Sequence, residues 1–195
     1  MGKELEKHPV ALKTGNEHLS DTGKTLLDFW RWNGSDLASN VTRGVFAEFI
    51  VASAIGVDLS VPRDEWSAWD LTSREGIRIE VKSSAYIQSW TQRKLSQIMF
   101  SIRPARTWDG AAGSMTDVPK RSADVYVFCL LKHKNKETLD PLNLDQWEFY
   151  VLSAAELNNY KRSSTAITLA SLQKLAQSIT YAKLHGAVIE KANLK

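Results

Sequence analysis

The pattern of apolar and polar positions divides the first third of the chain into an arm and two helices. Residues 1–16 are polar and unpatterned, which predicts a loose N-terminal arm. A helix is predicted over 22–32, and a longer one over 35–55, ending at Gly56. The second half of the longer helix, 45–52, is apolar nearly all round, which is typical of a buried helix.

The middle of the chain contains a predicted hairpin and a long loop. Two strands, over 68–72 and 77–83, are joined by a turn over 73–76. In the second strand, apolar side chains on one face alternate with charged side chains on the other. The polar segment 91–100 is predicted to be helical. Residues 103–122 are rich in Gly and Pro and form a loop long enough to suggest a function.

The last third is dominated by one continuous apolar segment. Val125–Leu131 is rich in β-formers, which predicts a central strand buried on both sides. Two more strands and three helices are predicted: strands over 147–152 and 167–169, and helices from 153, over 172–179 and over 183–191. We therefore expect a mixed α/β fold, with a sheet of four or five strands flanked by helices. Residues 17–195 are expected to form a single domain.

Composition excludes several classes of protein. Seven Trp, six Phe and five Tyr argue against intrinsic disorder. The most apolar run, 45–57, is interrupted by Glu48 and is too short to span a membrane. A single cysteine, Cys129, excludes a disulfide scaffold, and its place in the predicted central strand suggests a core residue. The charged N-terminus lacks the features of a signal peptide, so we expect a cytoplasmic protein without a membrane partner.

Three charged residues around the predicted hairpin form the candidate site. Side chains two apart on a strand share a face, so Glu80 and Lys82 project together, and the turn folds Asp70 back beside them. Neighbouring carboxylates repel each other, which favours a divalent cation between them, and hard oxygen ligands suit Mg²⁺. A nearby lysine can hold an attacking water and offset charge on a phosphate. The same alternation is also typical of any half-exposed strand, with Glu80 and Lys82 as a simple ion pair.

A fourth charged residue, Glu48, lies in the most apolar predicted helix. Glutamate is almost never fully buried unless it is paired, because an unpaired buried carboxylate is costly. Glu48 is therefore expected to face a cation. Its partner is either Arg43 or another basic side chain, in a structural ion pair, or the metal ion held by Asp70 and Glu80.

A helix with Glu48, then Asp70, then the triplet Glu80-Val81-Lys82 resembles the PD-(D/E)XK nuclease superfamily, which has the restriction-endonuclease-like fold. The resemblance implies that Asp70, Glu80 and the carbonyl of Val81 bind Mg²⁺, for which Mn²⁺ can substitute. It implies that Lys82 orients or activates the attacking water and that Glu48 completes the site.

The resemblance covers residues 40–155 and departs from the common pattern at Trp69, where many members have Pro. The segments 29–32 and 43–49 also resemble a bacterial group within the superfamily. Many members place a Gln or a basic residue after the triplet strand, near the substrate phosphate. The candidates for contact with nucleic acid are Ser84, Gln88, Gln92, Arg93, Arg103 and Arg106. The polar residues among them equally suit a strand exit and a helix cap.

The net charge of +3 is unevenly distributed along the chain. Residues 71–136 carry twelve Lys or Arg and five Asp or Glu, whereas the remainder is mildly acidic. Because phosphate contacts dominate affinity for nucleic acid, the DNA backbone is expected to lie on this segment. We therefore expect a Mg²⁺-dependent DNA endonuclease, for which cutting of both strands would favour a homodimer. The alternatives are a non-catalytic DNA-binding or assembly subunit with the same fold, and a purely structural domain.

Overall fold

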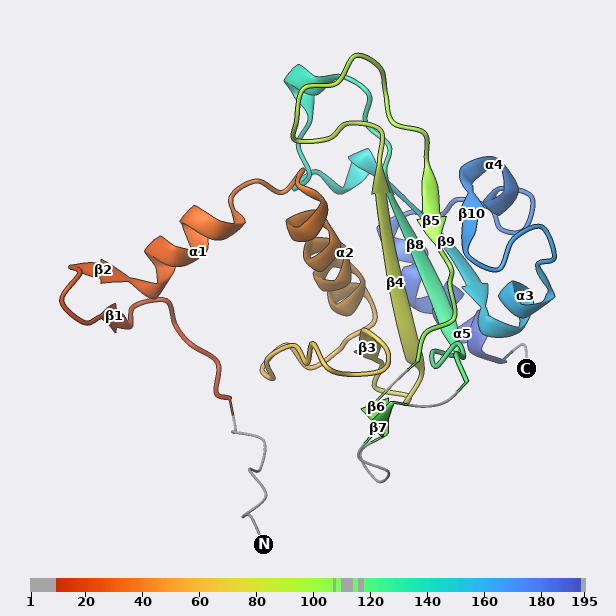
Figure 1. The fold of residues 1–195 in the computed structure, drawn as a ribbon, viewed down its shortest axis with the longest axis horizontal. Coiled ribbons are helices and arrows are strands. Elements are labelled where there is room, and N and C mark those ends of the chain that lie inside the picture. Colours follow the sequence, from red (N-terminus) through yellow and green to blue (C-terminus); the bar gives the residue numbers. More distant parts are fainter. Residues whose placement is uncertain (1–9, 107, 110–113, 116–117, 194–195) are drawn as a thin grey trace, which may run out of the picture.

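The computed structural model describes residues 10–106, 108–109, 114–115 and 118–193. At its centre is a mixed four-stranded sheet with the order β3-β4-β8-β9 (Figure 1). Strands β4 and β8 run parallel, and the two outer pairs are antiparallel. The strands are β3 (Leu71–Thr72), β4 (Arg78–Ala85), β8 (Val125–Leu131) and β9 (Trp147–Ser153). The predicted α/β fold with a mixed sheet flanked by helices is confirmed.

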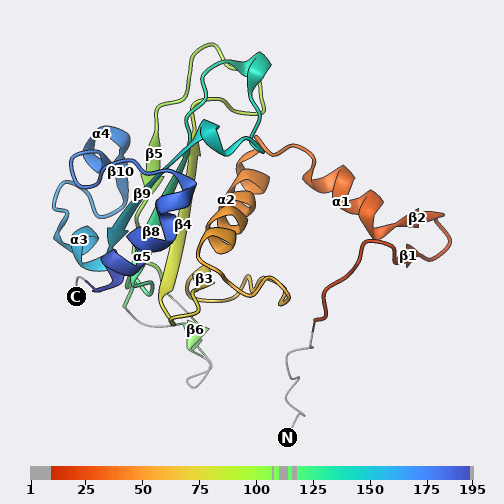
Figure 2. The same cartoon turned by 180° about the vertical axis from the view of Figure 1, so that it is seen from behind.

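Each face of the sheet is covered by a different layer (Figure 1 and Figure 2). Helices α2 and α5 pack on one face, into which Ile79 and Val81 of β4 point. The small sheet of β5 and β10, together with α3 and α4, covers Phe128 and Leu130 on the other face. These elements are α2 (Asn40–Ala54), α5 (Leu184–Asn193), β5 (Met99–Ser101), β10 (Ala166–Thr168), α3 (Ala154–Asn159) and α4 (Leu169–Leu172).

Strand β8 lies between these two layers, and all of its residues are buried. Val127 and Cys129 point toward the helices α2 and α5, and Tyr126 and Phe128 point toward β5. Cys129 has no exposed surface, which confirms that it is a core residue. The prediction of a central strand buried on both sides is therefore confirmed.

The N-terminal elements stand apart from the sheet (Figure 1). The hairpin of β1 (His18–Leu19) and β2 (Lys24–Thr25) leads into α1 (Leu26–Gly34), none of whose residues is buried. Helix α1 begins four residues later than predicted, because residues before it form the hairpin turn. Asp21 and Gly23 take left-handed φ values of 62° and 64° in that turn. Residues 1–9 of the predicted arm lie outside the described part of the chain.

Helix α2 begins after Ser39, whose side chain accepts the backbone N–H of Thr42, and not at residue 35 as predicted. Its end before Gly56 agrees with the sequence, since Gly56 has a φ of 69°. The prediction that its second half is buried all round is wrong. Val45 is 43% exposed and Phe49 is 53% exposed, because they face a pocket and not the sheet.

The helix predicted over 91–100 is also wrong. Residues 91–98 form an irregular loop, and the chain then enters β5, which pairs with β10. Ile98, Phe100 and Ile102 are buried while the residues between them are exposed, which is the two-residue period of a strand.

The C-terminal third follows the predicted order with one further difference. The short helix opened by Ser153 is confirmed, with a capping box between Ser153 and Glu156. The helix predicted over 172–179 is wrong, because α4 ends at Leu172 and Ile179 instead exchanges backbone hydrogen bonds with Phe149 of β9. The remaining short elements are β6 (Trp108–Asp109), β7 (Ser114–Met115), and the 3₁₀ helices η1 (Lys136–Thr138), η2 (Leu144–Gln146) and η3 (Tyr181–Lys183). Across the described ranges, no helix has the length and apolar character needed to cross a bilayer.

Candidate carboxylate site at the edge of the sheet

The short strand β3 brings Asp70 to the edge of β4. The Asp70 N–H donates to the carbonyl of Ile79 at 3.1 Å, and the strand pairing ends there. The next inward N–H on this edge, that of Val81, donates to the Asp70 carboxylate at 2.7 Å. The N–H and C=O of one strand residue point to the same edge, so the Val81 carbonyl also faces the Asp70 side. The prediction that the hairpin folds Asp70 beside the triplet is confirmed.

Glu80 and Lys82 lie on the face of β4 opposite Ile79 and Val81. The Lys82 Nζ donates to Glu80 Oε1 at 2.5 Å, and the two side chains are 21% (Glu80) and 30% (Lys82) exposed. Burial raises the pKa of Glu80, the charge of Asp70 raises it further, and Lys82 opposes both effects. The neighbouring strand places Tyr126 in register with Glu80, and burial together with the Glu80 charge raises the pKa of Tyr126 to about 12.

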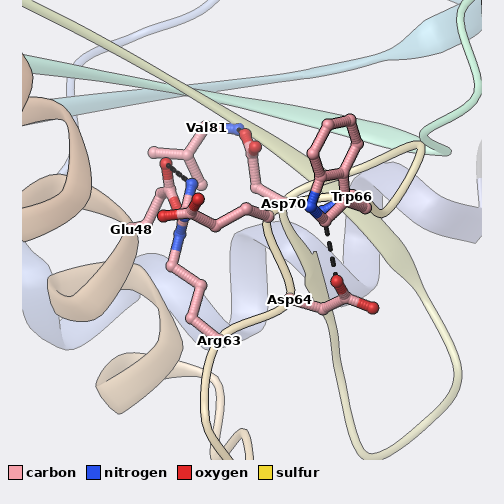
Figure 3. A network of polar contacts seen from close by, with 7 residues as sticks. Glu48, Arg63, Asp64, Trp66, Asp70 and Val81 are labelled. Atoms are coloured by element: carbon pink, nitrogen blue, oxygen red, sulfur yellow. Dashed lines mark hydrogen bonds and ion pairs between the residues drawn. The ribbon is translucent and has the colours of Figure 1, made fainter. Parts of the chain in front are cut away.

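Glu48 reaches the same edge from α2, with only 12% of its side chain exposed. Its carboxylate accepts hydrogen bonds from Nε of Arg63 and from Nη2 at 3.2 Å (Figure 3). The expected ion pair is therefore made with another basic side chain, and Arg43 as its partner is wrong. Burial raises the pKa of Glu48, the hydrogen bond from Arg63 opposes this, and the charge of Asp70 raises the pKa again.

Arg43 has a different task. It is 4% exposed and donates to four acceptors: the Ala38 carbonyl at 3.0 Å, Asn40 Oδ1 at 2.7 Å, Ser83 Oγ at 3.2 Å and Gln88 Oε1 at 3.3 Å. It therefore ties the start of α2 to β4 and to the loop that follows β4. Arg63 lies in an irregular loop fifteen residues beyond Glu48, where no local pattern marks it as the partner.

The three carboxylates reach β4 from three different sides. Glu48 comes from α2, on the face covered by α2 and α5. Asp70 comes from the edge where β3 pairs with β4, and Glu80 projects from the opposite face of β4. The charge of Asp70 raises the pKa of both Glu48 and Glu80, and the charge of Glu48 also raises the pKa of Glu80. Each already accepts an N–H: from Arg63, Val81 and Lys82, respectively. Among the described residues, no three His, Cys, Asp or Glu side chains are grouped as a cluster that could hold a metal ion.

The donor set nevertheless fits Mg²⁺ in chemical type. Carboxylate oxygens and a backbone carbonyl are hard ligands, and repulsion among partly buried carboxylates is relieved by a positive charge. Two cations, Arg63 and Lys82, supply that charge in this arrangement.

A pocket of about 360 Å³ adjoins this edge, between α2 and the segment 57–72, and both Glu48 and Asp70 line it. A second hollow, of about 450 Å³, lies between α3 and α4 and is lined by Lys161, Arg162 and Lys174. It lies away from the carboxylates.

The candidates for nucleic-acid contact separate into two groups. Ser84 and Gln88 are buried. Gln88 accepts from Arg43 and donates to the Ala85 carbonyl at 2.8 Å. Gln92 is partly buried and accepts the Gln88 backbone N–H at 2.7 Å, so both amides stabilise the loop after β4. The exposed candidates are Arg93, Arg103 and Arg106.

Comparison with known families identifies the kind of protein. Residues 5–169 match the family model described as bacteriophage T4 endonuclease IV. The chain belongs to this family. The matched region includes Glu48, Asp70, Glu80 and Lys82, so the carboxylate edge lies within the part shared with this endonuclease family. No curated protein matches the chain.

Proposed function

We propose that the protein is a metal-dependent endonuclease that hydrolyses phosphodiester bonds in DNA, with a site of the PD-(D/E)XK type. One observation carries the proposal. In a chain that belongs to an endonuclease family, the Asp70 carboxylate lies against the strand of the triplet Glu80-Val81-Lys82.

The roles of the residues follow from their chemistry. Glu48, Asp70, Glu80 and the Val81 carbonyl would hold Mg²⁺ or, as a substitute, Mn²⁺. A bound divalent ion polarises a phosphate and lowers the pKa of a water. Lys82 lies beside Glu80 with its side chain 30% exposed, so it can orient a water and offset charge on the phosphate. In the described arrangement Lys82 binds Glu80 and Arg63 binds Glu48. Both contacts must loosen before the carboxylates can hold a metal ion and Lys82 can hold a water.

The DNA backbone is proposed to cross the basic surface that carries Arg93, Arg103 and Arg106. These side chains are exposed and belong to the segment with the basic excess. Cutting of both strands is proposed to use a homodimer with two sites.

The test is cleavage of plasmid DNA in the presence of Mg²⁺ or Mn²⁺. Lys82→Ala and Asp70→Ala should each lower the rate at least about 100-fold, because they remove a proton-handling cation and a ligand. Lys161→Ala and Asp145→Ala are matched controls on exposed residues outside the carboxylate edge. A wild-type protein that cuts no DNA with either ion, or a Lys82→Ala variant as active as wild type, would contradict the proposal.

One observation favours a second candidate, a non-catalytic DNA-binding subunit with the same fold. Each of the three carboxylates already has a hydrogen-bond donor from its own chain. Such a subunit would bind duplex DNA in EDTA and show no Mg²⁺-dependent shift in thermal unfolding. An endonuclease with this site would show that shift, and Asp70→Ala would abolish it.

A further inference from the structure

The pocket beside the carboxylates has the dimensions of a binding site for one small group. Its volume of about 360 Å³ is at the lower end of the range for ligand pockets, which excludes a duplex but accommodates a single base. Because Glu48 and Asp70 line it, any occupant lies directly beside the carboxylate edge. Its apolar wall includes Val45, Phe49, Leu59, Val61, Pro62 and Leu71.

Apolar side chains at this pocket are unusually exposed. Phe49 is 53% exposed and Val61 is 63% exposed, although both line the pocket. Trp66, which is 90% exposed, stands between the lining residues Asp64 and Ser67. Its backbone N–H donates to Asp64 Oδ1 at 3.1 Å in the turn that presents the indole (Figure 3). Exposed apolar groups with a polar rim are typical of a ligand site.

The charge of the pocket favours a base over a phosphate. Its lining includes one cation, Arg63, which binds Glu48 and also Glu65. The carboxylates in the lining are Glu48, Asp58, Asp64 and Asp70. This excess of negative charge repels a phosphate, whereas a nucleobase is flat and uncharged and carries N–H donors.

We propose that this pocket holds one nucleobase of the DNA substrate next to the scissile phosphate, and that Trp66 stacks on the adjacent base. The inference rests on the proposed function, because it takes DNA as the substrate. A base enters such a pocket only after it leaves the helical stack. The base comes either from a single strand or from a duplex that extrudes it, and the chemistry of recognition is the same.

Binding in EDTA tests the pocket without cleavage. The probes are a labelled single-stranded oligonucleotide, the same sequence as a duplex, and an oligonucleotide of equal length in which every sugar is abasic. The abasic strand keeps the phosphates and removes the bases. Fluorescence anisotropy should show that the full-length wild-type protein binds the base-containing strand at least about 10-fold more tightly than the abasic strand. Weaker binding of the duplex would identify a single strand as the source of the base, and equal binding would identify extrusion.

Phe49→Ala and Trp66→Ala should each weaken binding of the base-containing strand by about 5- to 100-fold. Binding of the abasic strand should stay unchanged. Leu142→Ala is the control, since Leu142 is 66% exposed and lies outside the pocket. Both aromatic side chains are more than half exposed, so their loss should leave the fold intact, which thermal unfolding checks.

Two results would overturn the inference. One is equal affinity of the wild type for the base-containing and abasic strands. The other is a loss of affinity in Trp66→Ala and Phe49→Ala that is the same for both strands. Failure of the proposed function would give a different result. A protein that prefers the base-containing strand but shows no metal-dependent cleavage would support the base-binding pocket and contradict the hydrolytic role.

Discussion

At the scale of single residues, Gln88 tests whether a candidate for DNA contact has a structural role instead. Its side chain is 6% exposed and bonds to Arg43, Ala85 and Ser96. Gln88→Ala should lower the free energy of unfolding by about 1–3 kcal/mol, because it leaves buried partners unsatisfied. Urea denaturation measures this. The exposed Arg93 is the counterpart, since Arg93→Ala should weaken DNA binding and change stability by less than about 0.5 kcal/mol. Weaker DNA binding by a fully stable Gln88→Ala would contradict this assignment.

Cys129 gives a second prediction at this scale. The thiol has no exposed surface, and burial raises its pKa, so it is neither accessible nor ionised. A thiol reagent should leave the folded protein unmodified and react fully once the chain is unfolded in denaturant. Cys129→Ala should retain wild-type cleavage while costing about 1 kcal/mol of stability, since a small core group is lost. Rapid labelling of the native protein would contradict the burial of Cys129 in β8.

Contacts between residues that are close in sequence could be predicted from their spacing. Contacts between residues that are distant in sequence could not. Glu80 and Lys82 share a face because they are two apart on a strand, and the turn length placed Asp70. The partner of Glu48 was not predictable, because Arg63 comes from a loop with no periodicity. Arg43 was nearer in sequence, but its guanidinium points to the start of α2 and to Gln88.

At the scale of elements, Glu156 joins α3 to α5. It accepts the Ser153 N–H at 2.7 Å and the Lys191 ammonium at 2.6 Å. Burial raises its pKa, but Lys191 and Ser153 outweigh burial, so the pKa lies below the usual value of 4.5. Glu156→Gln should therefore cost about 1 kcal/mol at neutral pH, where the carboxylate is charged in both folded and unfolded chains.

The pH dependence of that difference tests the cause. A lowered folded pKa gives stability that is present above 4.5 and is lost as the pH falls through the folded pKa. The gap between wild type and Glu156→Gln, measured by urea denaturation, should therefore close in strongly acidic solution. Glu190→Gln, at an exposed position of α5, should show no such gap at any pH. A gap that widens with acid would refute the ion-pair explanation.

Elements whose sequence shows a single clear pattern of apolar and polar residues were predicted well. Elements whose sequence combines features of a helix and of a strand were not. The continuous apolar run Val125–Leu131 predicts a buried strand. Ser153 and Glu156, three residues apart, predict the start of a helix. The segment 91–100 combines polar residues, which favour a helix on the surface, with Ile98 and Phe100 two apart. The strand period prevails because β10, which lies more than sixty residues later, supplies a pairing partner that the local pattern cannot reveal.

At the scale of the whole molecule, the exposed helix α1 is the basis of a prediction about assembly. No residue of α1 is buried, and its exposed aromatic side chains include Phe29 at 44% and Trp32 at 83%. If the proposed homodimer uses this surface, sedimentation should give twice the chain mass of 21.9 kDa. Trp32→Glu should then sediment as a monomer, because a charge replaces a large apolar contact at the interface. Leu142→Glu is the control and should remain dimeric. A wild-type monomer would contradict the dimer itself, whereas a dimeric Trp32→Glu would place its interface elsewhere.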